Sequence, residues 1–155
     1  MKTLEEHQFS TRLSPDDYNE KTQTCKSRVF INNTRTDCII DGAILECCIK
    51  YDGHYLAFMT EDIPYEDSLH ISLLDKELTI LDQASLSWIY TTGTFKLIAL
   101  DEPDTVTFRF FDELAWRIKC LPGKQFYIPF FTEPRGTHRK QHFHRYFKIS
   151  ALKTA

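Results

Sequence analysis

The stretch that decides the fold is Ala43–Glu61, AILECCIKYDGHYLAFMTE, in which two runs of alternating residues flank a tight turn. Asp52-Gly53 is a residue pair that two-residue type I′ hairpins prefer, because both central positions of that turn need positive φ. The sequence therefore predicts two antiparallel strands joined by this turn.

The turn also predicts the register of this hairpin, because a two-residue loop leaves one pairing. The predicted pairs are Tyr51 with His54, Ile49 with Leu56, Cys47 with Phe58 and Leu45 with Thr60. These pairs gather apolar side chains on one face. The other face carries Lys50, Glu46, Tyr55 and Met59.

Similar patterns continue along the chain. LHISLLD and LTILDQ flank Lys76-Glu77, and FKLIAL and TVTFRFF flank the turn DEPD. In AWRIKCL, alternation places Trp116, Ile118 and Cys120 inward and Arg117 and Lys119 outward. Turn signals recur every 8 to 12 residues without a helical period. We expect an all-β, mainly antiparallel meander of about eight strands that forms a sandwich or partly closed barrel.

The 155 residues have the length of one ordinary domain. Residues 1–24 form a polar N-terminal segment, in which SPDD offers Ser14 as an N-cap and Pro15 at the first helical position. We expect at most a short helix there. Residues 25–155 should form a single β-rich domain that ends in a basic strand or arm over residues 135–155.

The N-terminus lacks the apolar run of a signal peptide, and no apolar stretch approaches the length of a membrane span. We expect a cytoplasmic protein that does not contact the membrane. The chain has five cysteines, an odd number, without CxxC spacing. Free thiols are therefore expected rather than disulfides or a zinc site.

Charge is unevenly distributed along the chain. Residues 135–155 contain six Lys/Arg and no acidic residue, which leaves thirteen Lys/Arg against all 22 Asp/Glu in residues 1–134. The segment therefore carries +6 and the body −9. An acidic body repels phosphate backbones and attracts cationic partners, so it argues against a general nucleic-acid binder and for a basic protein partner.

The C-terminal stretch RGTHRKQHFHRYFK, residues 135–148, allows three interpretations. A metal site would use its histidines, but no acidic or Cys ligand follows Glu133, so we expect no metal. A nucleic-acid site would use basic residues interleaved with aromatic ones, namely Arg139, Lys140, Arg145 and Lys148. The favoured interpretation is structural, because HFHRYFKI alternates as a last strand that would lie against the acidic body.

Motifs for catalysis are absent from the sequence. It has no GxSxG elbow, no Cys-centred signature and no glycine-rich phosphate loop, since its five glycines are scattered. His70, in the apolar alternation LHISLL, is interpreted as a sheet histidine. We expect a protein that is not an enzyme and has no cofactor, with a small histidine- or metal-dependent enzyme as a further alternative.

Aromatic residues beside carboxylates form the candidate partner-binding site, because the rings supply buried area while the charges steer encounter. The candidates come from TEDIPYEDS and SLSWIYTTGTF, and they are Glu61, Asp62, Tyr65, Glu66, Asp67, Trp88 and Tyr90. The alternative is that Trp88 and Tyr90 belong to the core and the acidic residues only keep sheet edges soluble.

The run LHISLLDKELTILDQASLSWIYTTGTFKLIALDEPDTVTFRFFDELAWRIKCL, residues 69–121, resembles small β-rich bacterial immunity proteins of polymorphic toxin systems, including those of contact-dependent growth inhibition. The resemblance implies a cytosolic protein that binds one cognate toxin, often a basic nuclease, and blocks its active site without catalysis. The alternative function is a nucleic-acid-associated module that uses the basic C-terminal segment.

Overall fold

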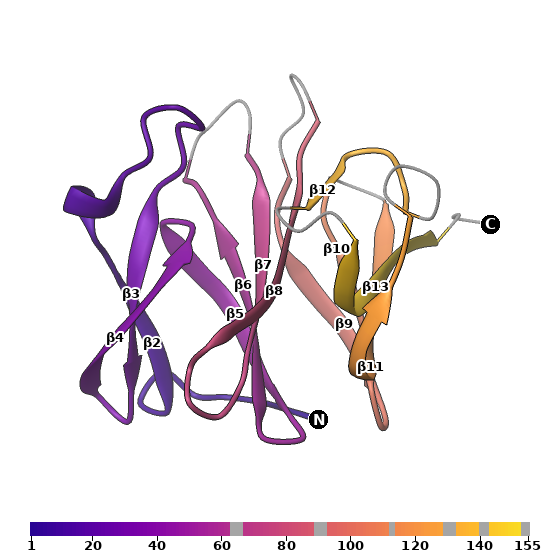
Figure 1. Ribbon diagram of the computed structural model, residues 1–155, viewed down its shortest axis with the longest axis horizontal. Coiled ribbons are helices and arrows are strands. Elements are labelled where there is room, and N and C mark those ends of the chain that lie inside the picture. The colour runs from indigo at the N-terminus through magenta and orange to yellow at the C-terminus, as the bar shows by residue number, and fades with distance from the viewer. Residues whose placement is uncertain (63–66, 89–92, 112–113, 129–132, 140–142, 153–155) are drawn as a thin grey trace.

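The computed structural model describes residues 1–62, 67–88, 93–111, 114–128, 133–139 and 143–152. These residues form thirteen strands and one 3₁₀ turn, η1 (Pro15–Asp17) (Figure 1). The strands are β1 (Lys2–Thr3), β2 (Phe9–Leu13), β3 (Lys26–Ile31), β4 (Thr34–Asp41), β5 (Ile44–Tyr51), β6 (His54–Thr60), β7 (Leu69–Leu74), β8 (Ile80–Leu86), β9 (Lys96–Asp101), β10 (Thr105–Arg109), β11 (Ala115–Phe126), β12 (Thr137–Arg139) and β13 (His144–Leu152).

The strands assemble into three antiparallel sheets. A six-stranded sheet has the order β1-β5-β6-β7-β8-β12, a four-stranded sheet the order β13-β11-β10-β9, and a three-stranded sheet the order β2-β3-β4. Figure 1 shows the six-stranded sheet in the middle, with one smaller sheet on each side. The prediction of an all-β antiparallel fold is confirmed, and the architecture is sandwich-like. No helix among the described residues is long and apolar enough to cross a membrane.

The middle sheet is buried on both faces. Toward the four-stranded sheet, Phe58 packs against Phe95 and Phe108 with ring centroids 5.0 and 5.2 Å apart. Toward the three-stranded sheet, Met59 belongs to a second core that contains Phe9. The run from Leu56 to Thr60 in β6 is consequently buried at every position, as in a strand covered on both sides.

The predicted register of the first hairpin is largely confirmed. Tyr51 pairs with His54, Ile49 with Leu56 and Cys47 with Phe58, and φ is positive at both Asp52 and Gly53. The predicted pair of Leu45 with Thr60 is wrong, because a bulge between Leu45 and Cys47 pairs Leu45 with Met59 and Ile44 with Thr60. A bulge inserts one residue and redirects the chain beyond it. Leu45 therefore packs against the second core rather than the first.

The other predicted hairpins form as β7–β8 and β9–β10. The first half of β11 alternates as expected, with Trp116, Ile118 and Cys120 buried. The basic C-terminal segment contributes β13, whose Arg145, Phe147 and Ile149 face inward. All five cysteines are free.

The N-terminal prediction needs a correction. The expected short helix exists as η1, with Ser14 Oγ donating to Asp17 Oδ2 over 2.6 Å. Residues 1–24, however, also contribute β1 and β2, and the described residues hold more strands than the predicted eight. These strands are short or polar, because each exposes one face, so their apolar periodicity is weak. Pairing with β5 and β3 stabilises them instead.

Gly42 gives a stability prediction. A Cβ at Gly42, whose φ is +115°, would lie 2.2 Å from Met59 Cβ, whereas a Cβ at Gly53, with φ +78°, would meet no atom within 4 Å. We expect Gly42→Ala to lower the free energy of unfolding by about 3 kcal/mol or more, and Gly53→Ala by about 1 kcal/mol from backbone strain alone. Urea denaturation measures both, and equal losses would contradict the close packing of Gly42 on β6.

Phe58 tests the burial of the middle sheet. Its side chain is fully buried between two other rings, so Phe58→Ala should cost about 3 to 5 kcal/mol of unfolding free energy. The matched control is Phe126→Ala, since Phe126 is an exposed residue of the same type, and it should stay within about 0.5 kcal/mol of the parent. A cost at Phe58 no larger than at Phe126 would refute its place in the core.

Candidate functional site

The acidic residues predicted to bind a partner do not all face solvent. Asp62 is exposed, whereas Glu61 is buried and Asp67 is half-buried. Asp67 Oδ1 accepts the backbone N–H groups of Glu61, at 3.0 Å, and of Ser68, at 2.8 Å. Tyr65 and Glu66 lie outside the described residues. Glu61 and Asp67 therefore make contacts inside the protein, just after the end of β6 and just before the start of β7.

Glu61 forms a close pair with His70. Glu61 Oε1 lies 2.6 Å from His70 Nε2, and Glu61 Oε2 accepts the backbone N–H of Cys25 at 3.0 Å. Burial acts to raise the pKa of Glu61, but the hydrogen bonds with His70 and Cys25 outweigh it, so the pKa lies below its ordinary value. The prediction that His70 is a sheet histidine fits its place in β7.

Trp88 is partly core and partly surface. Its side chain is 41% exposed and stacks on Phe111 with centroids 5.4 Å apart. Gly136 packs against it, since a Cβ there would lie 2.9 Å from Trp88 Nε1. Tyr90 lies outside the described residues. Of the predicted partner-binding residues that the structure describes, Asp62 and Trp88 remain the accessible ones.

Two of the four predicted nucleic-acid contacts point into the protein. Arg139 donates to Asp82 Oδ2 at 2.6 Å, to both carboxylate oxygens of Glu133 at 2.5 and 3.1 Å, and to the Phe147 carbonyl at 2.6 Å. Arg145 Nη1 lies 3.4 Å from Glu133 Oε1. Lys148 is exposed, and Lys140 lies outside the described residues. The structure therefore gives Arg139 and Arg145 an internal role.

Arg139 connects the middle sheet to the four-stranded sheet. Asp82 lies on β8, and its Oδ2 also accepts the backbone N–H of Tyr146 on β13 at 2.8 Å. The guanidinium lies over the Phe147 ring, 4.4 Å from its centroid. Burial acts to lower the pKa of Arg139, but its contacts with Glu133 and Asp82 raise it above the ordinary value. This cation remains charged and satisfied between the two sheets.

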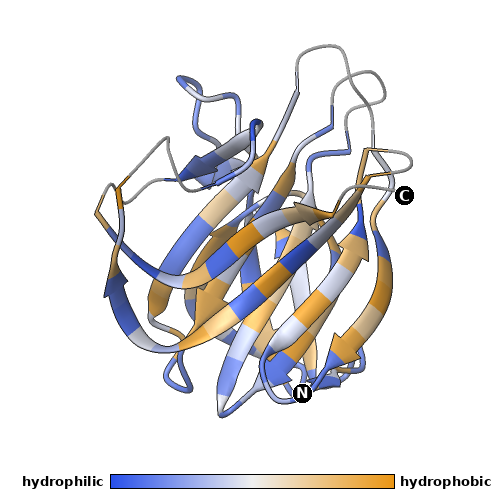
Figure 2. Cartoon of the chain, turned by 90° about the vertical axis from the view of Figure 1, so that its right-hand side faces the viewer, coloured by the Kyte–Doolittle hydropathy of each residue, from blue (hydrophilic) through white to orange (hydrophobic). Residues whose placement is uncertain are grey.

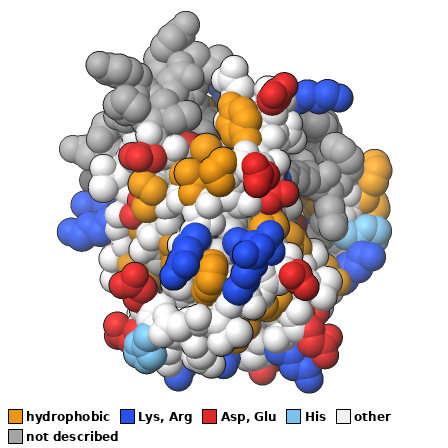
Figure 3. Space-filling view, turned by 90° about the vertical axis from the view of Figure 1, so that its left-hand side faces the viewer, with side chains coloured by type: hydrophobic (Ala, Val, Ile, Leu, Met, Phe, Trp, Pro, Cys, Tyr) orange, Lys and Arg blue, Asp and Glu red, His pale blue; other side chains and the backbone are white. Residues whose placement is uncertain are grey.

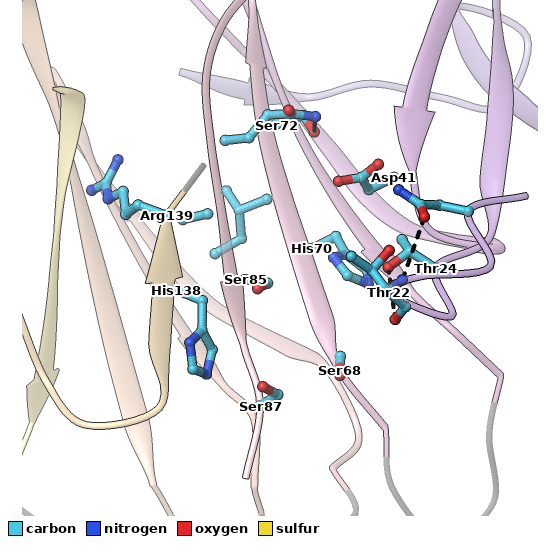
Figure 4. Close-up of a pocket in the computed structure, with 14 residues that line it drawn as sticks. Thr22, Thr24, Asp41, Ser68, His70, Ser72, Ser85, Ser87, His138 and Arg139 are labelled. Atoms are coloured by element: carbon cyan, nitrogen blue, oxygen red, sulfur yellow. Dashed lines mark hydrogen bonds between the residues drawn. The ribbon is translucent and has the colours of Figure 1, made fainter. Parts of the chain in front are cut away.

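A cavity of about 410 Å³ lies beside His70 (Figure 4). Its walls come from β7, β8 and β12 of the middle sheet, from Asp41 at the end of β4, and from residues 19–24. Six hydroxyl residues line it, together with His70 and His138. They are Thr22, Thr24, Ser68, Ser72, Ser85 and Ser87. Its size suits a small polar molecule.

The histidines do not assemble a metal centre among the described residues. His138 faces the cavity, whereas His144 lies at the start of β13 with its ring 6.1 Å from that of Phe126. His142 lies outside the described residues. No group of three or more His, Cys, Asp or Glu side chains converges in the part of the chain that the structure describes.

The cysteines lack the features of activated nucleophiles. Burial raises the pKa of Cys38 and of Cys47 to about 11 and that of Cys120 to about 12. These thiols are protonated at neutral pH, and the thiolate is the nucleophilic form.

An exposed apolar cluster extends from the far end of β11. Its members are Phe126, Ile128 and Phe143, with 65%, 56% and 57% of their surface exposed. Phe126 and Phe143 stack with centroids 6.3 Å apart and planes 7° from parallel. Tyr127, between Phe126 and Ile128 in sequence, is instead buried. We call the stacked pair Phe126 and Phe143, together with the exposed Ile128, the aromatic cluster.

Sequence reasoning missed the aromatic cluster and the cavity. Phe126 and Ile128 alternate around Tyr127, so a periodicity signal existed, but hydrophobicity alone assigns such residues to a core. The cavity likewise has a signal in the polar alternation of HIS on β7 and QASLS along β8. Its significance depends on which part of the middle sheet is left uncovered.

Acidic residues also gather at one end of the molecule. The pairing of Tyr55 with Leu74 puts the turns after β5 and β7 at the same end. The N-terminal ammonium, 2.8 Å from Glu102 Oε1, places the turn after β9 there too (Figure 1). We call this set the acidic end, and it comprises Asp52, Asp75, Glu77, Asp101, Glu102 and Asp104.

Comparison of the chain with protein-family models, with curated proteins and with solved structures found no match. The function must therefore be inferred from the surfaces described above.

The Glu61–His70 pair gives a pH prediction. Because the pKa of Glu61 is lowered in the folded state, its contribution to stability is present above the unfolded value of roughly 4.3 and is lost as pH falls through the folded value. Glu61→Gln should be less stable than the parent at pH 7. The difference in unfolding free energy should shrink as the pH falls from about 5 to 3, measured by urea denaturation across that range. A difference that grew on acidification would contradict this pairing.

Proposed function

We propose that this chain is a non-catalytic protein-binding module, an immunity protein that neutralises a toxin domain by covering its active site. The aromatic cluster carries the proposal. Stacked, solvent-exposed rings are costly in a free protein and are typical anchors of a protein interface, where aromatic residues supply most of the binding energy.

The framework beneath the aromatic cluster supports its role as an anchor. The Tyr127 ring contacts the guanidinium groups of both Arg139 and Arg145, whose carbons are 5.7 and 5.0 Å from its centroid. The Tyr127 backbone N–H donates to the Phe143 carbonyl at 2.9 Å. These contacts hold the two segments that present Phe126 and Phe143, so little conformational freedom is left to be lost on binding.

The acidic end supports a basic partner. Carboxylates on neighbouring turns create a negative potential that accelerates encounter with a cationic protein. This matches the basic toxin nuclease that the resemblance to immunity proteins implies. The cytoplasmic location belongs to the same proposal.

The test mixes this protein with the toxin domain encoded by the gene next to its own, because an immunity gene lies directly after a large toxin gene. We expect a tight complex and loss of toxicity. Phe126→Ala combined with Phe143→Ala should speed dissociation roughly 30-fold or more, the 2 kcal/mol expected of a hot spot, as measured by surface plasmon resonance. Leu13→Ala is the matched control, because Leu13 is 53% exposed on β2, and it should leave dissociation unchanged.

Charge reversal separates steering from anchoring. Glu77→Lys with Asp101→Lys should slow association at low salt and leave dissociation nearly unchanged, since exposed charges act mainly on encounter. Absence of a complex and of protection would refute the immunity function. A normal complex with the double phenylalanine variant would refute the aromatic cluster as its anchor.

A further inference from the structure

The outer face of the four-stranded sheet is basic. Its inner face fills the core with residues such as Phe108, Trp116 and Phe147, and the residues that alternate with them point away from the core. Figure 2 shows hydrophobic and hydrophilic residues following one another along these strands. Five of these outward residues are exposed cations. They are Lys96 on β9, Arg109 on β10, Arg117 and Lys119 on β11, and Lys148 on β13. We call this set the basic face.

The strand register puts like charges directly opposite one another on this face. Arg109 pairs with Lys96, and Lys119 pairs with Lys148. Opposed like charges destabilise a sheet. The structure shows no ion pair for any of the five among the residues that it describes, in contrast to the fully paired Arg139. The fold therefore keeps a repulsive arrangement that an external anion would relieve.

The composition of the basic face favours a nucleic acid over an acidic protein. The uncharged residues between the cations are small, namely Ala99, Thr107 and Ser150, and Ile98 is the large exposed apolar residue described beside them. The exposed ring of Phe126 pairs with His144 at the far end of this sheet. The part of the sheet that holds the five cations therefore offers few of the aromatic anchors of a protein interface. In an antiparallel sheet the Cβ atoms of directly paired residues lie about 5 Å apart, and the Cα atoms of residues two apart on one strand lie about 6.7 Å apart. A phosphate backbone can therefore contact several of the cations at once.

We infer that the basic face binds the phosphate backbone of a nucleic acid without base specificity. This site uses none of the residues that anchor the proposed toxin complex. It also differs from the nucleic-acid surface predicted from the sequence, because Arg139 and Arg145 lie inside the protein. Of the predicted contacts, Lys148 alone also belongs to the basic face.

The opposite outer face provides a matched control. On the three-stranded sheet, Arg12 and Arg35 are exposed beside Phe30, with the Arg12 guanidinium 4.6 Å from the Phe30 ring centroid. Figure 3 shows basic side chains gathered around a hydrophobic one on this face. Here an arginine lies over an aromatic ring, whereas the cations of the basic face make no such contact with the rings that the structure describes. Removing cations from either face changes the net charge equally.

The experiment measures fluorescence anisotropy of labelled single-stranded RNA, single-stranded DNA and duplex DNA from about 50 to 300 mM salt. We expect micromolar binding at the lowest salt and, for single strands, a slope of log K against log salt near −3.5 for five phosphate contacts. The variant Arg117→Gln/Lys119→Gln/Lys148→Gln should reduce that slope by about 2. The control Arg12→Gln/Arg35→Gln/Lys76→Gln takes its third cation from the exposed turn after β7, so that it removes the same charge, and it should leave the slope unchanged.

Three results would overturn the inference. They are no binding to any of the probes at 50 mM salt, equal loss in the control variant, and binding of labelled polyglutamate in place of nucleic acid. Circular dichroism and thermal melting establish that the variants fold. The two proposals fail separately, because the double phenylalanine variant should bind nucleic acid normally and the basic-face variant should still bind the toxin domain.

Discussion

Burial of the middle sheet on both faces is the constraint on which the structure depends. A strand such as β6 must offer Phe58 to one core and Met59 to the other, so neither small sheet can be lost without exposing a continuous apolar surface. The same constraint requires Gly42 beside Met59. It also explains why the polar strands β2 to β4 fold, since each needs only one apolar face to cover the middle sheet.

Local chemistry predicted the fold class and most of the hairpins. Asp52-Gly53 specified its turn without tertiary information, because the φ angles demanded there suit few residue pairs. The bulge between Leu45 and Cys47 could not be predicted, since it depends on how the start of β5 packs against the core that the middle sheet shares with the three-stranded sheet. The N-terminal strands were missed for a related reason, because their few apolar residues complete a core that other segments build.

Candidate site residues were harder to predict than the fold. Alternation shows that Arg145 and Lys148 lie on opposite sides of β13, but it does not say which side meets another sheet. The inward side is the one that contacts Glu133 and Asp82, and these two residues come from separate parts of the chain. For the same reason, the charge difference between the body and the C-terminal segment did not indicate which charged residues are exposed. Cations and carboxylates distant in sequence are neutralised inside, while the outer faces and turns hold the charges that a partner meets.

The position of β13 has a consequence for biosynthesis. β13 follows the other twelve strands that the structure describes, yet Phe147 and Ile149 fill the core between the middle and four-stranded sheets, and the contact of Arg139 with the Phe147 carbonyl joins those sheets. The ribosome therefore releases β13 after its partners have already emerged. Until then Trp116 and Ile118 on β11 lack their partners Ala151 and Ile149 on β13, and the nascent chain presents an open apolar surface of the kind that chaperones recognise.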